Sequence, residues 1–221
     1  MIEIKKGKTP KELLQYRQQD FSSYEDMPSD VKKKVINSLL SEQGHLCAYC
    51  MSRIDSGEGK HRATIEHCIP QAVSTEKERL DYKNMLAVCW GNRDAHLNSS
   101  KSCDAKRGSL PKEQQDMKKL NVFDSRTLAA IGYKSDGTIF SNDTDLDEDL
   151  NKRLNLNCEV RRLKECRLQS LRALHREINR KYPNATAPKK YFRELLEYYT
   201  RPCEKRTPYI GIIIAWLRKK V

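Results

Sequence analysis

The feature that most constrains this chain is a pair of cysteines separated by two residues, Cys47 and Cys50 in the run CAYC. A C-x-x-C turn lets two thiolates approach one tetrahedral zinc ion, and a closed structural site needs two further ligands. Cys89 and Cys103 lie downstream, so the spacing predicts a four-cysteine structural zinc site in the middle of the chain. Thirteen residues separate this second pair, and His96, which falls among them, is the alternative fourth ligand.

The chain contains eight cysteines in all, which raises the alternative of a disulfide framework. The opening run MIEIKKGKTP has no apolar signal region, and a chain of 221 residues can bury a core without disulfides. We therefore expect bound metal and a cytoplasmic location. No membrane partner is expected, because the longest apolar run, 209–217, is only about half as long as a membrane span.

The net charge of +12 is concentrated in the last third of the chain. Residues 152–221 contain 19 Lys and Arg against 6 Glu, a net of +13, whereas residues 1–151 contain 23 basic and 24 acidic residues, a net of −1. A basic region attracts polyanions, so nucleic acid is the first partner to consider. A solvated helical face and a surface for an acidic protein partner are the alternatives.

The periodicity divides the chain into three parts and predicts a mainly α protein of the α+β class. Residues 1–44 form N-terminal helices, 45–125 a small module of short strands and loops around the cysteines, and 126–221 a hairpin followed by a basic helical region. The expected helices cover 9–19, 29–43, a segment through Val160, Leu163, Leu171, Leu174 and Ile178, then 191–199 and 209–220; the expected strands are 63–67, 84–89, 128–133 and 138–140.

Four motifs of the central module occur in an order that resembles the HNH endonucleases. They are CAYC at 47–50, IEH at 65–67 with a proline three residues on, NMLAVC at 84–89 and CDAKRG at 103–108. The resemblance covers about 60 of the 221 residues. Each motif alone is weak, and the four in this order are specific. It implies a zinc-stapled ββα-metal fold that cuts phosphodiester bonds of DNA or RNA, tRNA included.

Within that family the chain looks most like PtuB, the nuclease of the Septu antiphage systems, including the retron-linked forms. The run CWGN at 89–92 and the late CD-x-K-x-G at 103–108 add to this likeness. The resemblance implies an antiviral role with an ATPase of the PtuA type as partner. A retron reverse transcriptase and its DNA are further partners that it admits.

The adjacent residues Glu66 and His67 are the expected centre of the catalytic site. His67 titrates near neutrality and can take a proton from water. The resemblance assigns Glu66 to a catalytic Mg²⁺ or Mn²⁺ ion and adds Asp104 as the second ligand, and hard oxygen ligands suit such ions. It also gives Asn84 the work of hydrogen-bonding the loop that carries His67, with a local turn cap as the alternative.

Lys106 and Arg107 follow Asp104 closely, and we expect them to contact the substrate backbone. A second function from another class stays open. In that alternative the chain is a zinc-stapled nucleic-acid-binding or adaptor protein without activity, in which Glu66 and His67 only pack.

Overall fold

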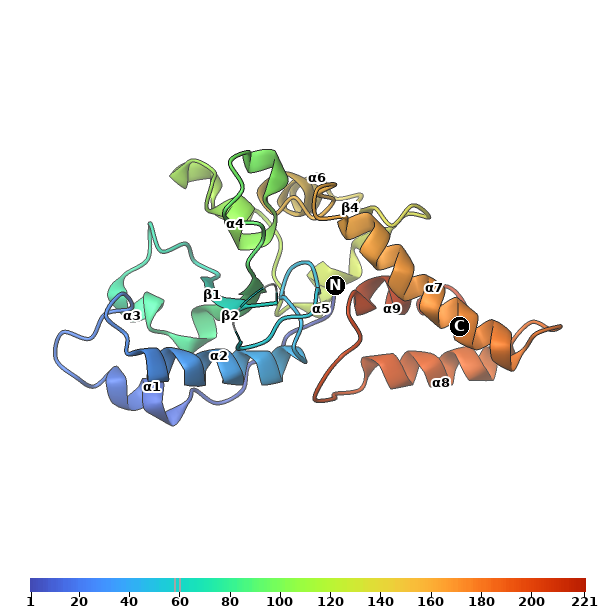
Figure 1. Ribbon diagram of the computed structural model, residues 1–221, viewed down its shortest axis with the longest axis horizontal. Helices are drawn as coiled ribbons and strands as arrows, with labels where there is room; N and C mark the ends of the chain where they lie inside the picture. The colour runs from blue at the N-terminus through green and yellow to red at the C-terminus, as the bar shows by residue number, and fades with distance from the viewer. Residues whose placement is uncertain (58, 60) are drawn as a thin grey trace.

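The computed structural model describes residues 1–57, 59 and 61–221, a mixed α/β protein with two small antiparallel sheets (Figure 1). The N-terminal half of these residues contains α1 (Lys11–Tyr16), α2 (Ser29–Gln43), β1 (Ala63–His67), α3 (Glu76–Arg79), η1 (Tyr82–Asn84), β2 (Met85–Cys89), η2 (Asn98–Ser100), α4 (Cys103–Arg107) and η3 (Lys112–Gln114). The C-terminal half contains α5 (Ser125–Ala129), β3 (Ile131–Tyr133), β4 (Ile139–Ser141), α6 (Thr144–Glu148), the π-helical turn η4 (Asp149–Arg153), α7 (Leu163–Lys181), α8 (Lys189–Thr200) and α9 (Ile210–Arg218).

The central sheet is the antiparallel pair of β1 and β2. His67 is opposite Met85 and Glu66 is opposite Leu86, while all five residues of β2 are buried. The predicted strand at 63–67 is confirmed, and the second begins one residue later than expected because Asn84 closes the turn η1. The short helix α4 packs against β2, so the module has the strand–strand–helix order that the sequence predicts.

The helix α2 lies beneath the central sheet in Figure 1 and contacts both of its strands. Its predicted stop is confirmed, because Gly44 adopts φ 60° and ends the helix in the left-handed conformation that glycine tolerates best. Any side chain there would also collide with Arg206, whose Cγ lies 2.5 Å from the position of a Cβ. The helix predicted at 9–19 is shorter and ends at Tyr16.

The second hairpin corrects one prediction. Residues 128 and 129, expected in a strand, belong to the helix α5, and β3 begins only at Ile131. The side chain of Asp124 accepts a hydrogen bond from the backbone N–H of Arg126 at 3.0 Å, which caps this helix. The prediction that Val160 belongs to the apolar side of the long basic helix is also wrong. Val160 precedes α7 and is 65% exposed.

The helices α7, α8 and α9 form a C-terminal lobe to the right of the central sheet in Figure 1. Helices α7 and α8 are separate, as predicted from the helical patterns through Ile178 and at 191–199. Helix α9 joins the lobe to the rest, because Ile210 and Ile214 belong to the main core while Ile213 and Leu217 pack with α7 and α8. Among the described residues, no helix combines the length and apolar character that crossing a membrane requires.

Candidate metal centre and cleft

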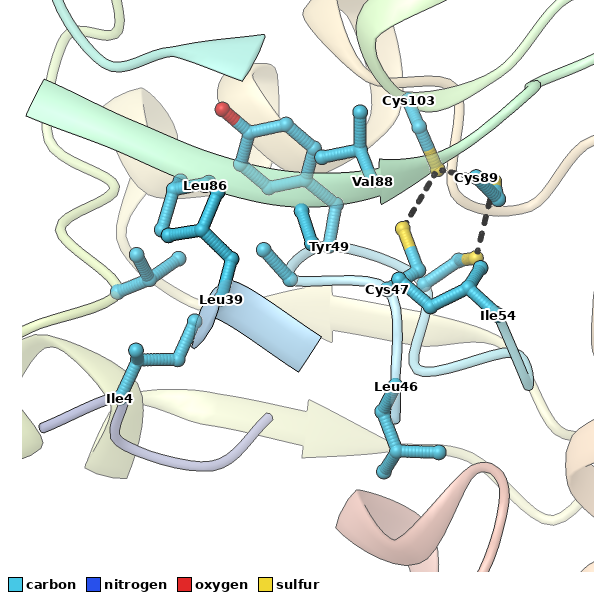
Figure 2. Packing of buried hydrophobic residues seen from close by; sticks show 14 of the residues in the cluster. Ile4, Leu39, Leu46, Cys47, Tyr49, Ile54, Leu86, Val88, Cys89 and Cys103 are labelled. Atoms are coloured by element: carbon cyan, nitrogen blue, oxygen red, sulfur yellow. Dashed lines mark hydrogen bonds between the residues drawn. The ribbon is translucent and has the colours of Figure 1, made fainter. Parts of the chain in front are cut away.

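Four buried cysteines lie together beside the end of β2. Cys47, Cys50, Cys89 and Cys103 present sulfurs that all lie within 4.8 Å of one another (Figure 2). Three Sγ–Sγ distances are 3.7, 3.7 and 3.9 Å. A tetrahedral zinc ion with Zn–S bonds of about 2.3 Å holds its sulfurs about 3.8 Å apart, so these residues fit zinc as a group.

The turn that carries the first cysteine pair is fixed by backbone hydrogen bonds. The N–H of Cys47 donates to the carbonyl oxygen of Ser52 at 2.9 Å. The N–H of Met51 donates to the carbonyl oxygen of Cys47 at 3.0 Å. Met51 takes φ 60°, which lets the chain reverse tightly. Ala48 ties the turn to β2 through a 3.1 Å bond to the carbonyl of Ala87. Both sulfurs are thereby aimed at the end of β2.

The thirteen residues between Cys89 and Cys103 form a closed loop, which brings the two cysteines together. The N–H of Ser102 donates to the carbonyl of Gly91 at 2.9 Å, so the two ends of the loop meet. Gly91 has φ 66°, and a Cβ there would lie 2.3 Å from the carbonyl oxygen of Ser102. Only glycine permits this approach. His96 lies on the loop, is exposed, and is not among the four clustered ligands.

A polar cleft of about 650 Å³ lies along β1, next to the metal centre but distinct from it. We call it the β1 cleft. Three of the expected catalytic side chains, Glu66, His67 and Asp104, lie in it together with several residues that were not predicted as site residues. Its lining includes Tyr24, Lys32, Arg62, Glu66, His67, Gln71, Trp90, Arg93, Asp104 and Arg107.

The imidazole of His67 is held by hydrogen bonds at both nitrogens. Nε2 lies 2.8 Å from the carbonyl oxygen of Arg79, which can only accept, so Nε2 carries the hydrogen. Nδ1 then has the lone pair and accepts from the side-chain amide of Gln71 at 2.9 Å. Tyr24 packs edge-on against the ring with centroids 4.5 Å apart. Burial lowers the pKa of His67 below its usual value, so the ring is neutral at pH 7.

Asn84 links the backbone just after His67 to the backbone of α3, which carries the carbonyl that His67 contacts. Its Oδ1 accepts from the backbone N–H of Ile69 at 2.8 Å, and its Nδ2 donates to the carbonyl of Glu78 at 3.0 Å. The residue is 7% exposed and does not reach the β1 cleft. These are the contacts that a positioning role for Asn84 requires.

Glu66 is buried and bound to an arginine. Its Oε1 accepts from Nη1 of Arg107 at 2.5 Å and from the hydroxyl of Tyr49 at 3.2 Å, while Oε2 has no hydrogen bond among the described residues. Burial and the nearby carboxylate of Asp104 raise the pKa of Glu66 well above its usual range, against the opposing effect of Arg107. The two carboxylates therefore face each other closely enough to repel.

Asp104 pairs with the guanidinium of Arg93, which comes from the loop before Cys103. Arg93 and Arg62 also lie over the ring of Trp90, with centroid distances of 5.3 and 4.4 Å. These three residues at the mouth of the β1 cleft were not predicted as site residues. The only sequence signal was the CWGN run, which places Trp90 directly after Cys89 of the predicted zinc site.

Arg107 lies in the lining of the β1 cleft but is buried and bound within the protein. The side chain is 3% exposed and is committed to Glu66 and to the backbone carbonyls of His67, Cys68 and Gln115. Four of its five N–H groups are thereby used, so it supports the site instead of presenting a free guanidinium to a substrate. Lys106 is half-buried and is not part of the lining of the β1 cleft.

Comparison of the chain with protein-family models finds no match, and comparison with curated proteins finds none either. What the structure itself establishes is a mixed α/β fold with a buried four-cysteine cluster that can hold a metal such as zinc. Functional conclusions therefore depend on the chemistry of the β1 cleft and on the sequence resemblance.

Proposed function

We propose that the protein is a zinc-stapled endonuclease of the HNH type that hydrolyses phosphodiester bonds of nucleic acid in the β1 cleft. One observation carries the proposal. A neutral His67, fixed through Nε2 and with the Nδ1 lone pair accepting from an exposed side chain, shares the cleft with the facing carboxylates of Glu66 and Asp104. A base beside paired oxygen ligands is what metal-assisted phosphodiester hydrolysis needs.

His67 acts as the general base through Nδ1. Gln71 is exposed and reaches this atom from the side of the cleft, so a water molecule can replace its amide. That water donates an O–H to the same lone pair, which is the arrangement for removing its proton. The hydrogen bond to Arg79 and the bonds made by Asn84 keep the ring aimed while the charge develops.

The carboxylates of Glu66 and Asp104 are the residues that would hold a divalent cation. Their hard oxygens and mutual repulsion fit Mg²⁺ or Mn²⁺, and Oε2 of Glu66 has no partner among the described residues. When bound, the cation supplies electrostatic stabilisation of the charge that builds on the phosphate. The buried Arg107 holds Glu66 in place through its ion pair. The exposed Arg93 can exchange its ion pair with Asp104 for one with a phosphate oxygen.

The biological setting is proposed from the sequence resemblance alone. It comprises a role in antiphage defence, an ATPase partner of the Septu type, and in the retron form a reverse transcriptase with its DNA. A cytoplasmic location belongs to the same proposal.

A non-catalytic binding protein is the competing function, and one observation favours it. Both carboxylates of the cleft are already neutralised, Glu66 by Arg107 and Asp104 by Arg93. If these pairs persist with divalent cations present, the cleft has no cation site and the chain acts only by binding.

The test compares the wild-type protein with His67→Ala and with His96→Ala, a matched variant at an exposed histidine outside the cleft. Each is incubated with plasmid DNA and with total RNA containing tRNA, in Mg²⁺ or Mn²⁺, with and without the ATPase. We expect His67→Ala to lose cleavage by about 10²- to 10⁴-fold and His96→Ala to keep it. A wild-type protein that cuts neither substrate under any of these conditions, or a His67→Ala variant that cuts as well, overturns the proposal.

A further inference from the structure

The solvent face of α7 carries a row of arginines that the proposed chemistry does not use. Arg172, Arg176 and Arg180 are exposed and follow one another at four-residue steps. At 3.6 residues per turn they fall within an arc of about 80° and span about 12 Å along the helix. The opposite side of α7 is buried in the C-terminal lobe through Leu174 and Ile178. We call this row the arginine face.

The charge of the arginine face is not neutralised within the protein. None of its three guanidinium groups forms an ion pair or a hydrogen bond among residues 1–57, 59 and 61–221. Over its whole length, α7 contains six Lys and Arg against two Glu. Uncompensated cations on one face repel each other, and an anionic partner relieves that repulsion.

A second cleft lies between the end of β2 and the first turns of α7. This α7 cleft has a volume of about 700 Å³ and is lined by Arg162, Glu165 and Gln169 beside Trp90. Arg53 and Arg161 line it as well, with guanidinium groups that already donate hydrogen bonds within the protein. Trp90 also lines the β1 cleft. Gln169 lies one turn before Arg172 on the same side of α7. The α7 cleft therefore reaches from Trp90 to the first turns of α7, where the arginine face begins.

We infer that the α7 cleft and the arginine face bind the phosphate backbone of nucleic acid outside the cleavage site. The inference deepens the proposed function and rests on it for the role of the bound backbone as part of the substrate, while the binding surface itself needs no cleavage. Guanidinium groups form paired hydrogen bonds with phosphate oxygens, and contacts of this kind position a substrate without reading its sequence.

Nucleic acid fits this surface better than an acidic protein does. A protein interface places apolar or aromatic side chains at its centre and charges at its rim. The exposed positions along this side of α7 are instead Glu165, Gln169, Arg172, Arg176 and Arg180, with one acid and no large apolar residue among them. A nucleic acid duplex offers one charge about every 1.7 Å, so a straight row of cations can engage any stretch of it.

The test measures the binding of the full, zinc-loaded chain to a labelled DNA duplex and to a labelled single-stranded RNA by fluorescence anisotropy at several salt concentrations. The variant R172Q/R176Q/R180Q removes the arginine face, and K8Q/K11Q/K33Q removes the same charge from exposed lysines in the N-terminal part of the chain. Zinc content and thermal unfolding establish that both variants are folded.

We expect the arginine variant to lose about tenfold or more in affinity and its salt slope to fall by about 2 to 3, since each lost phosphate contact with duplex DNA removes about 0.9. The lysine variant should stay close to wild type. Equal affinity and slope in the two variants overturn the inference. Poly-L-glutamate that competes as well as nucleic acid at equal charge overturns it in favour of an acidic protein. Failure of the proposed function is separate, because His67→Ala and wild type would then cut alike while binding still depends on the arginine face.

Discussion

Nη1 of Arg161 lies 3.1 Å from Sγ of Cys89, and the same atom lies 2.9 Å from the hydroxyl of Ser102. Arg161 thus joins the start of α7 to the four-cysteine cluster. Zinc on four thiolates has a net double negative charge, which a partly buried guanidinium offsets in part. Hydrogen bonds from the neighbouring cysteine thiols, together with the charge of Arg161, hold the pKa of Cys89 well below its usual range.

Arg161→Ala should therefore weaken zinc binding. Loss of a hydrogen bond to a metal ligand reduces metal affinity by about 10- to 100-fold, so a chromogenic chelator should remove zinc from the variant at lower concentration. Arg162→Ala is the matched control, because Arg162 is the exposed neighbour and makes no hydrogen bond to a cysteine of the cluster. Identical zinc retention in the two variants would contradict a role for Arg161 at the metal.

The fourth zinc ligand can be tested by a pair of substitutions. Cys103→Ser should lower the bound zinc from one ion per chain to a small fraction and destabilise the fold, since a structural zinc ion contributes about 10 kcal/mol or more to small metal-stabilised folds. His96→Ala should keep one zinc ion, because His96 is exposed on the loop. Zinc is measured by atomic emission on the purified proteins. Loss of zinc in the His96 variant alone would reverse the assignment.

The central module was predictable because its signals are local. The cysteine spacing identified all four members of the cluster, and the β-branched residues of β1 together with the apolar run of β2 gave the paired strands. The helices α2, α8 and α9 were also expected, since each has an apolar side at helical spacing. Where α5 replaced a strand, the Asp124 cap outweighed the apolar pattern of the residues after it.

The surroundings of the site were not predictable, because they depend on segments far apart in the chain. Arg107 becomes a buried partner of Glu66 only when α4 is docked against the central sheet by Cys103. Arg62, Trp90 and Arg93 meet through the loop that Gly91 closes, and nothing in their spacing indicates that contact. Sequence reasoning found the residues with characteristic chemistry and missed those that define the shape and charge of the cleft.

The buried ion pair of Glu66 and Arg107 should make the two residues interdependent in their effect on the free energy of unfolding. Arg107→Met leaves the buried Glu66 without its charged partner, with the Tyr49 hydroxyl still donating to it, and removes the donors of Arg107 from three backbone carbonyls. We therefore expect a loss of about 3 to 5 kcal/mol in the free energy of unfolding. Glu66→Gln combined with Arg107→Met removes the buried charge and should recover part of that loss. Urea unfolding of the single and double variants measures both. A double variant that is less stable than Arg107→Met would contradict this account.

Gln71 should control the pH at which His67 works as a base. Its amide donates a hydrogen bond to Nδ1 and so favours the neutral ring, adding to the burial that lowers the pKa of His67 below 6.5. A lowered pKa keeps the ring unprotonated to lower pH, so the cleavage rate of the wild type should be constant at neutral pH and fall only as the pH drops below 6.5. Gln71→Ala removes the donor and should shift this fall toward higher pH, while the rate at pH 8 stays at or above that of the wild type because Nδ1 is more accessible to water.

The matched control for Gln71→Ala is Gln115→Ala, which changes the other glutamine of the β1 cleft while its backbone carbonyl still accepts from Arg107. The measurement is the initial rate of substrate cleavage between pH 5 and 8 at constant ionic strength, with binding followed separately so that altered affinity is not mistaken for altered protonation. A profile for Gln71→Ala that overlays the wild type, or one that shifts toward lower pH, would mean that Nδ1 of His67 is not the atom that takes the proton. Below pH 6.5 the unfolded chain binds a proton at His67 that the folded wild-type protein resists, so the wild type loses stability as the pH falls. Gln71→Ala should raise the pKa of His67 in the folded protein and so make this loss of stability smaller.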